Sequence, residues 1–462
     1  MTGRLVIGSL ALLVSACAGP RPAIPPAAEV APPAQWRGDH KGSDVVVDAQ
    51  WWRRFGDATL TGLVEEALGH NADIEIAAAR IEEARAQFAA ARGARMPQVQ
   101  AVGTGGRTRS VNPFGIDIAQ WAAQGEVQAS FDLDLFGRLR SSAAAAKAQL
   151  LASDDSRQTV RLAIAAGVVS GYVQLRTFDE RRAILRRTLD ARAGTLTLIR
   201  RRAEAGYSSQ LDLAQAEAEY RAAAQAIPTV DLAIAKLENG LSILLDRAPG
   251  PVARGAAFTV LTIPTAPSQL PARLLRQRPD IAAAEHQIVA ADRTLDAARA
   301  AFLPDIKLAA SGGFVASSLL PDNPLSIFSL GGSVLAPIFN GGRIRAQADG
   351  AAARRDQAAF AYRKAALTAF REVEDGMASV ERYAEQEDEL TRQQAALLRV
   401  QQLAALRYRE GYSPYLEQLD AERSLLSSQL SLVQTRGDRL LASTALFQAL
   451  GGGWQPSAQW NE

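Results

Sequence analysis

The chain has 462 residues, of which 48% are hydrophobic, and its formal net charge is only +2. This length allows two or three domains, and the near-neutral balance gives no support for nucleic-acid binding, which needs a strongly basic face. Aromatic residues are sparse at 6%, which favours long, closely packed helices over an aromatic-rich sandwich. The single cysteine excludes an intramolecular disulfide.

The first segment has the pattern of an export signal, residues 1–16. A positive Arg4 precedes an apolar run that is too short for an ordinary membrane-spanning helix. The stretch Val-Ser-Ala-Cys that ends at Cys17 is typical of a bacterial lipobox, in which the cysteine thiol carries a lipid. An ordinary secretory signal with an incidental cysteine is the alternative. Ala18 follows the cysteine, which by analogy with bacterial sorting favours the outer membrane.

A Pro/Ala-rich segment, residues 17–45, follows the signal and predicts an extended, lipid-anchored tether. The apolar spacing from Trp51 to Leu68 predicts an amphipathic helix. A second helix is predicted from Asp73 to Arg95, where Pro97 follows.

The period then changes from helical to alternating. From Glu126 to Leu135, apolar and polar residues alternate without error, which predicts a strand with lipid on one face and water on the other. Its polar face would line a barrel lumen with Glu126, Gln128, Ser130 and Asp132. Residues 99–104 are the expected partner strand, and the glycine-rich stretch 103–106 is interpreted as a turn. A hairpin that caps a soluble domain is the alternative.

Two further strands are predicted in the second half of the chain, over 306–314 and 328–338. Long proline-free stretches follow each strand pair, and the one from Arg138 to Ala205 would span roughly 100 Å as a helix. A lone helix of that length has no core, so it must pack in a coiled bundle. Pro228 should break or kink the return helix of the first half.

A fixed offset relates the two halves. Gly206-Tyr207-Ser208 returns as Gly411-Tyr412-Ser413, which is 205 positions later, and an offset of 207 relates Asp73 to Asp280 upstream. These offsets indicate a duplicated unit. We therefore predict a first repeat, 46–245, with a β-hairpin over 98–136 and a helical hairpin over 138–245. A linker, 246–270, leads to a second repeat, 271–450, with a β-hairpin over 305–341 and a helical hairpin over 342–450, and a tail, 451–462, ends the chain.

The sequence carries no catalytic constellation. His40, His70 and His286 lie far apart, and none has a metal-ligand spacing. No nucleotide-binding glycine loop with a following lysine is present, so the chain cannot drive transport by itself. We expect neither an enzyme nor a cofactor, apart from the covalent lipid on Cys17.

The order of these motifs resembles the outer-membrane efflux lipoproteins of the TolC superfamily, in the NodT/OprM-like branch that serves tripartite RND efflux systems. The segments Leu274–Ile281, which reads LLRQRPDI, and Pro337–Gly342, which reads PIFNGG, carry the resemblance most specifically. It implies a mainly α fold with a small β part, in which duplicated coiled-coil hairpins join four strands per protomer. Three protomers would form a 12-stranded β-barrel in the outer membrane and a helical tunnel in the periplasm.

The resemblance also implies a function. The family conducts drugs or other small molecules passively to the exterior, and its partners are a periplasmic adaptor and an inner-membrane RND pump. The outer-membrane duct of a type I protein secretion system is the alternative. A periplasmic adaptor would carry one hairpin without lipid-facing strands, and a hydrolytic enzyme would need the missing constellation.

The candidate site residues lie around the two Gly-Tyr-Ser turns, which we expect at the periplasmic tip in contact with the adaptor. By resemblance, Leu416 and Asp420 match the constriction of the lipoprotein branch, and Glu417 lies beside them. Asp212 and Tyr408 match positions that tie neighbouring hairpins together, whereas an arginine that some relatives use there is Ser413 in this chain. The alternative is that these acids only solvate a loop.

Overall fold

The computed structural model describes residues 20–37, 47–111, 113–264, 271–322 and 324–455. The chain divides into two compact units, each made of three stretches of sequence. The first unit comprises the described parts of Met1–Val30, Ala79–Asp155 and Ala282–Lys364, and the second comprises those of Ala31–Ala78, Ser156–Ile281 and Ala365–Glu462. Cys17 and the signal segment lie outside the described residues.

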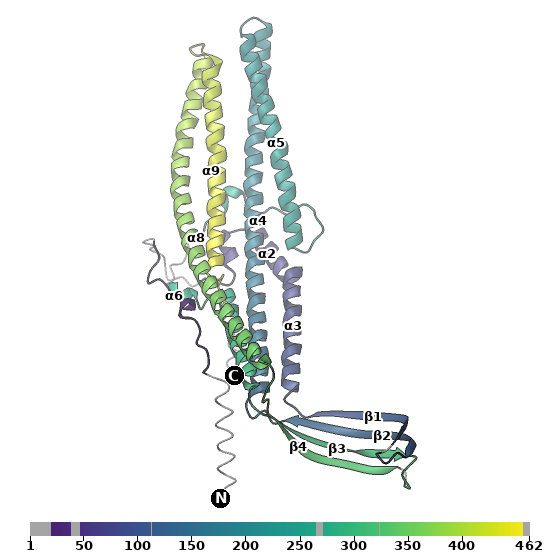
Figure 1. Ribbon diagram of the computed structural model, residues 1–462. Coiled ribbons are helices and arrows are strands. Elements are labelled where there is room, and N and C mark those ends of the chain that lie inside the picture. Colours follow the sequence, from purple (N-terminus) through teal and green to yellow (C-terminus); the bar gives the residue numbers. More distant parts are fainter. Residues whose placement is uncertain (1–19, 38–46, 112, 265–270, 323, 456–462) are drawn as a thin grey trace. The chain divides into compact units, whose positions relative to one another are not determined.

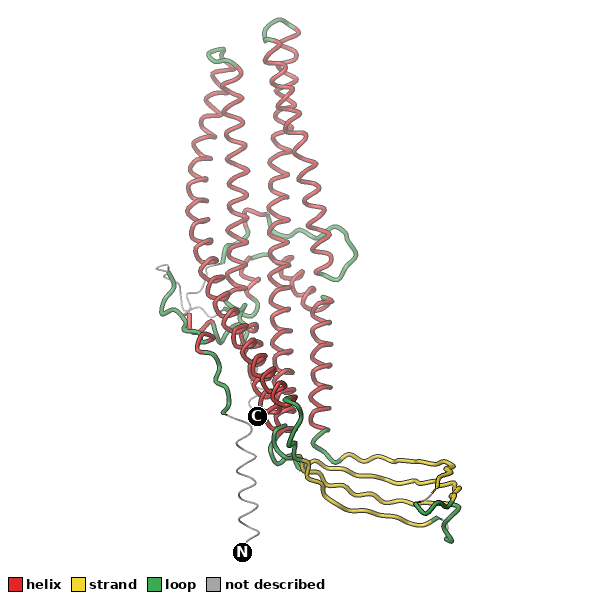
Figure 2. The backbone as a smooth tube through the Cα atoms, viewed as in Figure 1, coloured by secondary structure: helices red, strands yellow, loops and turns green. Residues whose placement is uncertain are grey.

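The first unit contains one antiparallel sheet in the order β1-β2-β3-β4, shown in Figure 1 and in yellow in Figure 2. Its strands are β1 (Gln98–Val111), β2 (Asp117–Asp132), β3 (Asp305–Ser317) and β4 (Leu325–Leu335). The four predicted strands are therefore confirmed, although several of their bounds differ from the prediction.

The turn predicted over residues 103–106 was wrong, because these residues pair with β2 in the middle of β1. Cross-strand pairing overrides the low strand propensity of glycine here. The predicted end of β2 at Leu135 was also wrong. Asp134 has a φ of +45°, and its carboxylate accepts the N–H groups of Leu139 and Arg140 at 2.8 Å each, so this residue already caps the next helix. β4 ends before Pro337, which has no N–H to donate.

Eight α-helices are present among the described residues, and six of them match in length between the halves. They are α2 (Ala58–His70), α3 (Ala72–Gly93), α4 (Arg138–Glu204), α5 (Gln210–Leu244), α6 (Pro271–Leu274), α7 (Pro279–Ala300), α8 (Arg343–Arg409) and α9 (Tyr415–Ala449). α8 begins and ends 205 positions after α4, and α9 begins and ends 205 positions after α5. α7 begins and ends 207 positions after α3. α4 with α5, and α8 with α9, run side by side as long hairpins (Figure 1).

Two helix predictions need correction. The helix expected from Trp51 to Leu68 is interrupted, because a 3-10 turn over Trp51–Phe55 ends at Gly56, which has a φ of +75°. Asp57 then caps α2 through the N–H groups of Thr59 and Leu60. Pro228 does not break the return helix, since α5 continues through it, and the kink stays a prediction. The described helices contain no stretch that is long and apolar enough to cross a membrane.

The tether is not free of the folded body within its described part. Arg355 on α8 is almost fully buried, and its guanidinium donates to the carbonyl oxygens of Pro22 and Ala23, at 2.5 and 2.9 Å. Arg21 pairs with Asp292 on α7 at 2.6 Å. A short 3-10 turn over Pro26–Ala28 forms where we expected only extended chain, because proline at its first position has a suitable preset φ.

The core of the second unit is built around the early tryptophans. Trp51 is fully buried and stacks on Phe447 with ring centroids 5.5 Å apart. Asp57 is also buried, and its Oδ2 accepts hydrogen bonds from the Tyr172 hydroxyl and the Ala256 N–H, at 2.7 and 2.9 Å. Burial and the neighbouring carboxylate raise the pKa of Tyr172 to about 12, so this phenol stays a donor.

Candidate functional sites in the hairpin tips and the sheet

The two hairpin tips have the same backbone structure. Gly206 and Gly411 have φ values of +80° and +79°, which side chains other than glycine adopt only with strain. The N–H of Tyr207 donates to the carbonyl of Arg202 at 2.7 Å, and the N–H of Tyr412 donates to that of Arg407 at 2.8 Å. These bonds end α4 and α8 in the same Schellman motif. Both tyrosine side chains are left about four-fifths exposed, at 85% and 79%.

The first turn of the return helix differs between the tips. In the first tip, Ser209 and Asp212 form a capping box, in which the Asp212 carboxylate accepts the Ser209 N–H at 3.1 Å. In the second, Pro414 takes the cap position without a side-chain bond. Glu417, the counterpart of Asp212 at the 205-residue offset, pairs instead with Arg407 at 3.2 Å. Both candidate acids are thus engaged within their own hairpins.

An apolar group near the tips, here called the tip cluster, joins the two hairpins. Its buried members come from α4, α5 and α9 and are Leu196, Ile199, Ala216, Tyr415 and Leu419. Tyr415 is only 3% exposed, and burial first, with nearby carboxylates second, raises its pKa to about 12. The phenol is therefore neutral at physiological pH.

The candidate residue Tyr408 belongs to this contact. Its ring centroid lies 5.6 Å from that of Tyr415, and the guanidinium carbon of Arg202 lies 5.8 Å from the same Tyr408 centroid. Arg202 is on α4, so Tyr408 does contact the other hairpin of its own chain. It does so through a cation–π interaction with Arg202, whereas Asp212 is held by its own capping box.

A buried charged group, here called the Glu219 network, lies along the same interface. Arg192 on α4 donates to a Glu219 side-chain oxygen and to the Glu219 carbonyl, at 2.8 Å each. Arg423 on α9 donates to the other carboxylate oxygen at 2.9 Å, which raises the pKa of Arg423. Arg192 and Glu219 are buried at 7% and 8% exposure. Three helices from both hairpins thus share one buried carboxylate.

Leu416 and Asp420 lie four residues apart on α9, on a side that is left exposed and is here called its open face. Leu416 is 47% exposed, and the Asp420 side chain is 65% exposed and lies 3.6 Å from Arg423. Their neighbours Tyr415 and Leu419 are buried in the tip cluster. The structure therefore separates the candidate residues, with Tyr408 inside the hairpin contact and Leu416 and Asp420 on its open face.

The residues that join the hairpins were not among those predicted from the sequence, and they are Arg192, Arg202, Glu219, Tyr415 and Arg423. Tyr415 could have been found, since Tyr415 and Leu419 lie four residues apart on α9 and so share one apolar helix face. Glu219 directly precedes Tyr220 on α5, but nothing in the local sequence indicates which arginines reach it.

The sheet of the first unit has two chemically different faces. Glu126, Gln128, Ser130 and Asp132 alternate along β2 and share one face, opposite Gly313, Ser311, Ala309 and Lys307 of β3. The other face carries large apolar side chains that are at least half exposed, including Trp121, Val127, Phe314 and Phe328.

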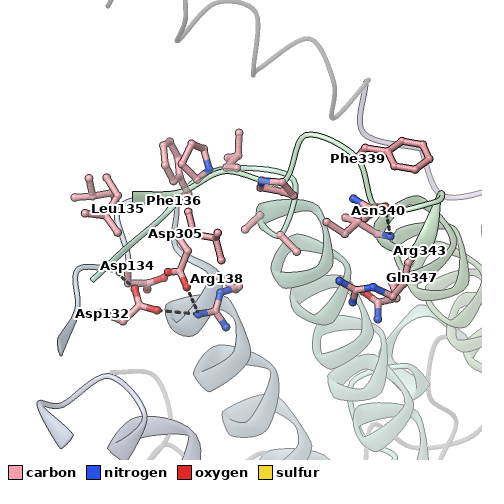
Figure 3. A pocket seen from close by; sticks show the side chains of 18 residues that line it. Asp132, Asp134, Leu135, Phe136, Arg138, Asp305, Phe339, Asn340, Arg343 and Gln347 are labelled. Carbon is pink, nitrogen blue, oxygen red and sulfur yellow. Dashed lines mark hydrogen bonds and ion pairs between the residues drawn. The ribbon is translucent and has the colours of Figure 1, made fainter. Parts of the chain in front are cut away.

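A cavity of about 410 Å³ lies where the sheet meets the helices of the same unit (Figure 3). On one side of the cavity, the Asp132 carboxylate accepts a hydrogen bond from the Arg138 guanidinium at 2.8 Å. The Asp305 carboxylate lies 3.9 Å from the same guanidinium. On the other side are Asn340 and Arg343, with the exposed ring of Phe339. Arg138 thus anchors the start of α4 to the ends of β2 and β3.

Comparison with known proteins identifies the fold and the motifs together. The profile of the family described as "Outer membrane efflux protein" matches residues 63–246 and 270–452, one match in each half. The chain belongs to this family. The resemblance inferred from its motifs is confirmed, and membership separates the chain from periplasmic adaptors.

The chain is similar to several outer-membrane efflux components. It is 35% identical over 412 residues to the solvent efflux pump outer membrane protein SrpC of Pseudomonas putida, which covers 87% of each chain. It is 33% identical to the outer membrane protein OprJ of Pseudomonas aeruginosa, over 96% of this chain and 95% of OprJ.

Solved channels share its fold. The match to the outer-membrane channel OprN covers 95% of this chain and 99% of the OprN chain, with a TM-score of 0.87 and 29% sequence identity. The open-state MtrE channel of Neisseria gonorrhoeae matches 94% and 98% with a TM-score of 0.83 at 29% identity. The predicted TolC-like fold is therefore confirmed. The family and these relatives are channel or transport proteins, and this member is an outer membrane efflux protein.

Proposed function

We propose that this protein is the outer-membrane exit duct of a tripartite efflux pump and passively conducts drugs or other small molecules to the exterior. The observation that carries the proposal is the two-faced sheet with unpaired edges, joined in sequence to two long helical hairpins. Family membership supports efflux over type I protein secretion.

The sheet accounts for a barrel made of several copies. β1 and β4 are edge strands with no further strand partner in the described part of the chain. A bilayer offers no water to unpaired backbone groups, so open strand edges are excluded from its apolar core. Closure must come from other copies. Three copies of four strands, as the resemblance implies, make a 12-stranded barrel.

The faces of the sheet define the inside and the outside of this barrel. Glu126, Gln128, Ser130 and Asp132 would line an aqueous lumen, because charged groups on the lipid face are strongly unfavourable. The exposed apolar face, with Phe328 at 90% exposure, would face lipid.

The hairpin tips provide the candidate gate. In the trimer, Leu416 and Asp420 on the open face of α9 would meet their symmetry mates at the constriction. Tyr408 would hold the two hairpins of a protomer together, while Asp212 and Glu417 would shape the turns that carry the gate. Three carboxylates brought close together attract cations, so we expect a cation-preferring channel.

The remaining parts have roles in assembly. The exposed turns Gly206–Ser208 and Gly411–Ser413 would contact a periplasmic adaptor, and an inner-membrane RND pump would supply the energy. The proposed repeats, 46–245 and 271–450, would each contribute one strand pair and one hairpin. Lipid on Cys17 would anchor the chain to the outer membrane. No enzymatic step is assigned to the protein.

Oligomeric state and acylation test this proposal. Native mass spectrometry of detergent-extracted protein should show a trimer, and a clean monomer in a detergent that preserves related barrels would contradict the barrel. Metabolic labelling with a palmitate analogue should mark the wild type and not Cys17→Ser. An unlabelled wild type would remove the lipid anchor from the proposal without affecting the channel.

A further inference from the structure

A second cavity, of about 280 Å³, lies inside the second unit and shares no lining residue with the tip cluster. Its walls include the indole rings of Trp51 and Trp52 and the side chain of Leu162, and Arg161 provides its charged group. The backbone of Gly451–Gly453 closes one side. This combination of apolar walls and a single charge differs from the polar lumen proposed for the barrel.

The two indole nitrogens are unsatisfied donors. Trp51 and Trp52 are 0% and 6% exposed, and the Nε1 atom of each has no acceptor in the described part of the chain. Buried polar groups are nearly always hydrogen-bonded, so two unpaired donors on tryptophans that line one cavity call for an acceptor. Gly452 packs closely against this wall of the cavity, since a Cβ there would lie 2.3 Å from Leu162 Cδ1 and 3.2 Å from the Trp51 Nε1 atom.

Arg161 supplies a positive charge without a counter-charge. No Asp or Glu is found among the described residues that line the cavity, and Arg161 has no ion-pair partner within the described ranges. Burial, followed by repulsion from Arg157 one turn earlier on α4, lowers the pKa of Arg161. The Arg161 guanidinium is still charged at neutral pH, because arginine keeps its proton in proteins. An anion in the cavity would neutralise this positive charge.

We propose that this cavity binds a small organic carboxylate. Its carboxylate group would accept hydrogen bonds from Arg161 and from at least one indole N–H, because a guanidinium matches a carboxylate in geometry and charge. Its apolar part would lie against the Trp rings and Leu162. The volume is just below the range of drug-sized sites, so the ligand is of about the size of benzoate.

Calorimetric titration of the detergent-solubilised full-length protein with benzoate tests this site. Benzyl alcohol is the neutral analogue of the same shape, and sulfate is an anion without an apolar part. Benzoate should bind saturably, and benzyl alcohol should bind about tenfold more weakly or worse, because it loses the charge-assisted bonds. Sulfate should also bind more weakly, since it leaves the apolar walls uncovered.

Three variants locate the site. Arg161→Gln should weaken benzoate binding about tenfold or more, and Trp52→Phe, which removes one donor but keeps an aromatic ring, should weaken it about fivefold. Arg157→Gln is the matched control, because it removes the same charge from α4 outside the cavity lining, and it should change affinity less than about threefold. Circular dichroism melting verifies that each variant folds.

Several results would overturn the proposal. One is that benzoate does not bind saturably to the wild type. Another is that benzyl alcohol binds to the wild type as tightly as benzoate does. The third is that Arg161→Gln and Arg157→Gln lose the same amount of benzoate affinity. Should Arg161→Gln fail to fold, the Trp52→Phe affinity and the benzyl alcohol comparison on the wild type still decide the question.

Discussion

Replacing Glu219 with glutamine should loosen the contact between the two hairpins. The substitution keeps the size of the side chain but removes the charge that Arg192 and Arg423 share at 2.8 and 2.9 Å. Arg192 is 7% exposed, so its guanidinium would stay buried without a full counter-charge. Removing one partner of a buried ion pair typically costs about 3–5 kcal/mol.

The expected loss lies at the lower end of that range. The Arg423 side chain is 51% exposed, so water replaces part of what it loses, and Arg192 keeps its bond to the Glu219 carbonyl. We expect about 3 kcal/mol of local stability to be lost, which is roughly a hundredfold increase in local opening. Amide hydrogen exchange over residues 190–222 and 415–425 measures this opening directly.

Glu217→Gln is the matched control for this substitution. Glu217 is on the same helix, but its side chain is 51% exposed and lies 3.7 Å from the exposed Arg221. Exposed pairs of this kind contribute about 0–1 kcal/mol, so exchange should change less than about fivefold. If Glu219→Gln and Glu217→Gln accelerate exchange equally, the Glu219 network does not hold the hairpins together. Conductance in planar bilayers should rise for Glu219→Gln only.

Three further predictions follow from other parts of the molecule. The double variant Leu416→Ala with Asp420→Ala should raise bilayer conductance and make cells leaky to large antibiotics such as vancomycin, and unchanged conductance and ion preference would place the gate elsewhere. Asp57→Ala should cost about 3 kcal/mol in chemical denaturation, because it removes a helix cap and leaves the buried Tyr172 O–H without its acceptor; a loss below about 1 kcal/mol would contradict this. The bond of His286 to Asp155 at 2.7 Å raises the histidine pKa. The wild type should therefore be more stable than His286→Gln, and this difference in unfolding free energy should be complete below about pH 6.5, the unfolded-state pKa. The difference should be lost as pH rises through the higher folded-state pKa. Equal stability differences between the two proteins at pH 5.5 and pH 9 would refute this prediction.

The sequence by itself determined the repeated architecture. Offsets of 205 and 207, seen in motifs such as Gly206-Tyr207-Ser208 and Asp73-Ile74, reappear in the ends of the helices of both halves. Alternation along β2 indicated a strand with two chemically different faces, and the backbone register places its polar residues on one face. These features are local or periodic, so a single sequence contains them in full.

Local conformational exceptions were harder to predict. Asp134 ends β2 early because its carboxylate caps α4 from a positive φ, although its position in the alternating pattern is that of a strand residue. The glycines at 103–106 are typical of a turn, but pairing with β2 extends them. In both cases a contact made by the folded backbone outweighed the preference of the residue.

Only the tertiary structure decided how the hairpins are joined. Tyr415 is buried against α4 and α5, and Glu219 binds arginines that are 27 residues before it and 204 residues after it in the chain. Trp51, Trp52 and Arg161 line one cavity for the same reason. Such partners share no sequence period, and their interaction depends on which faces of long helices pack together.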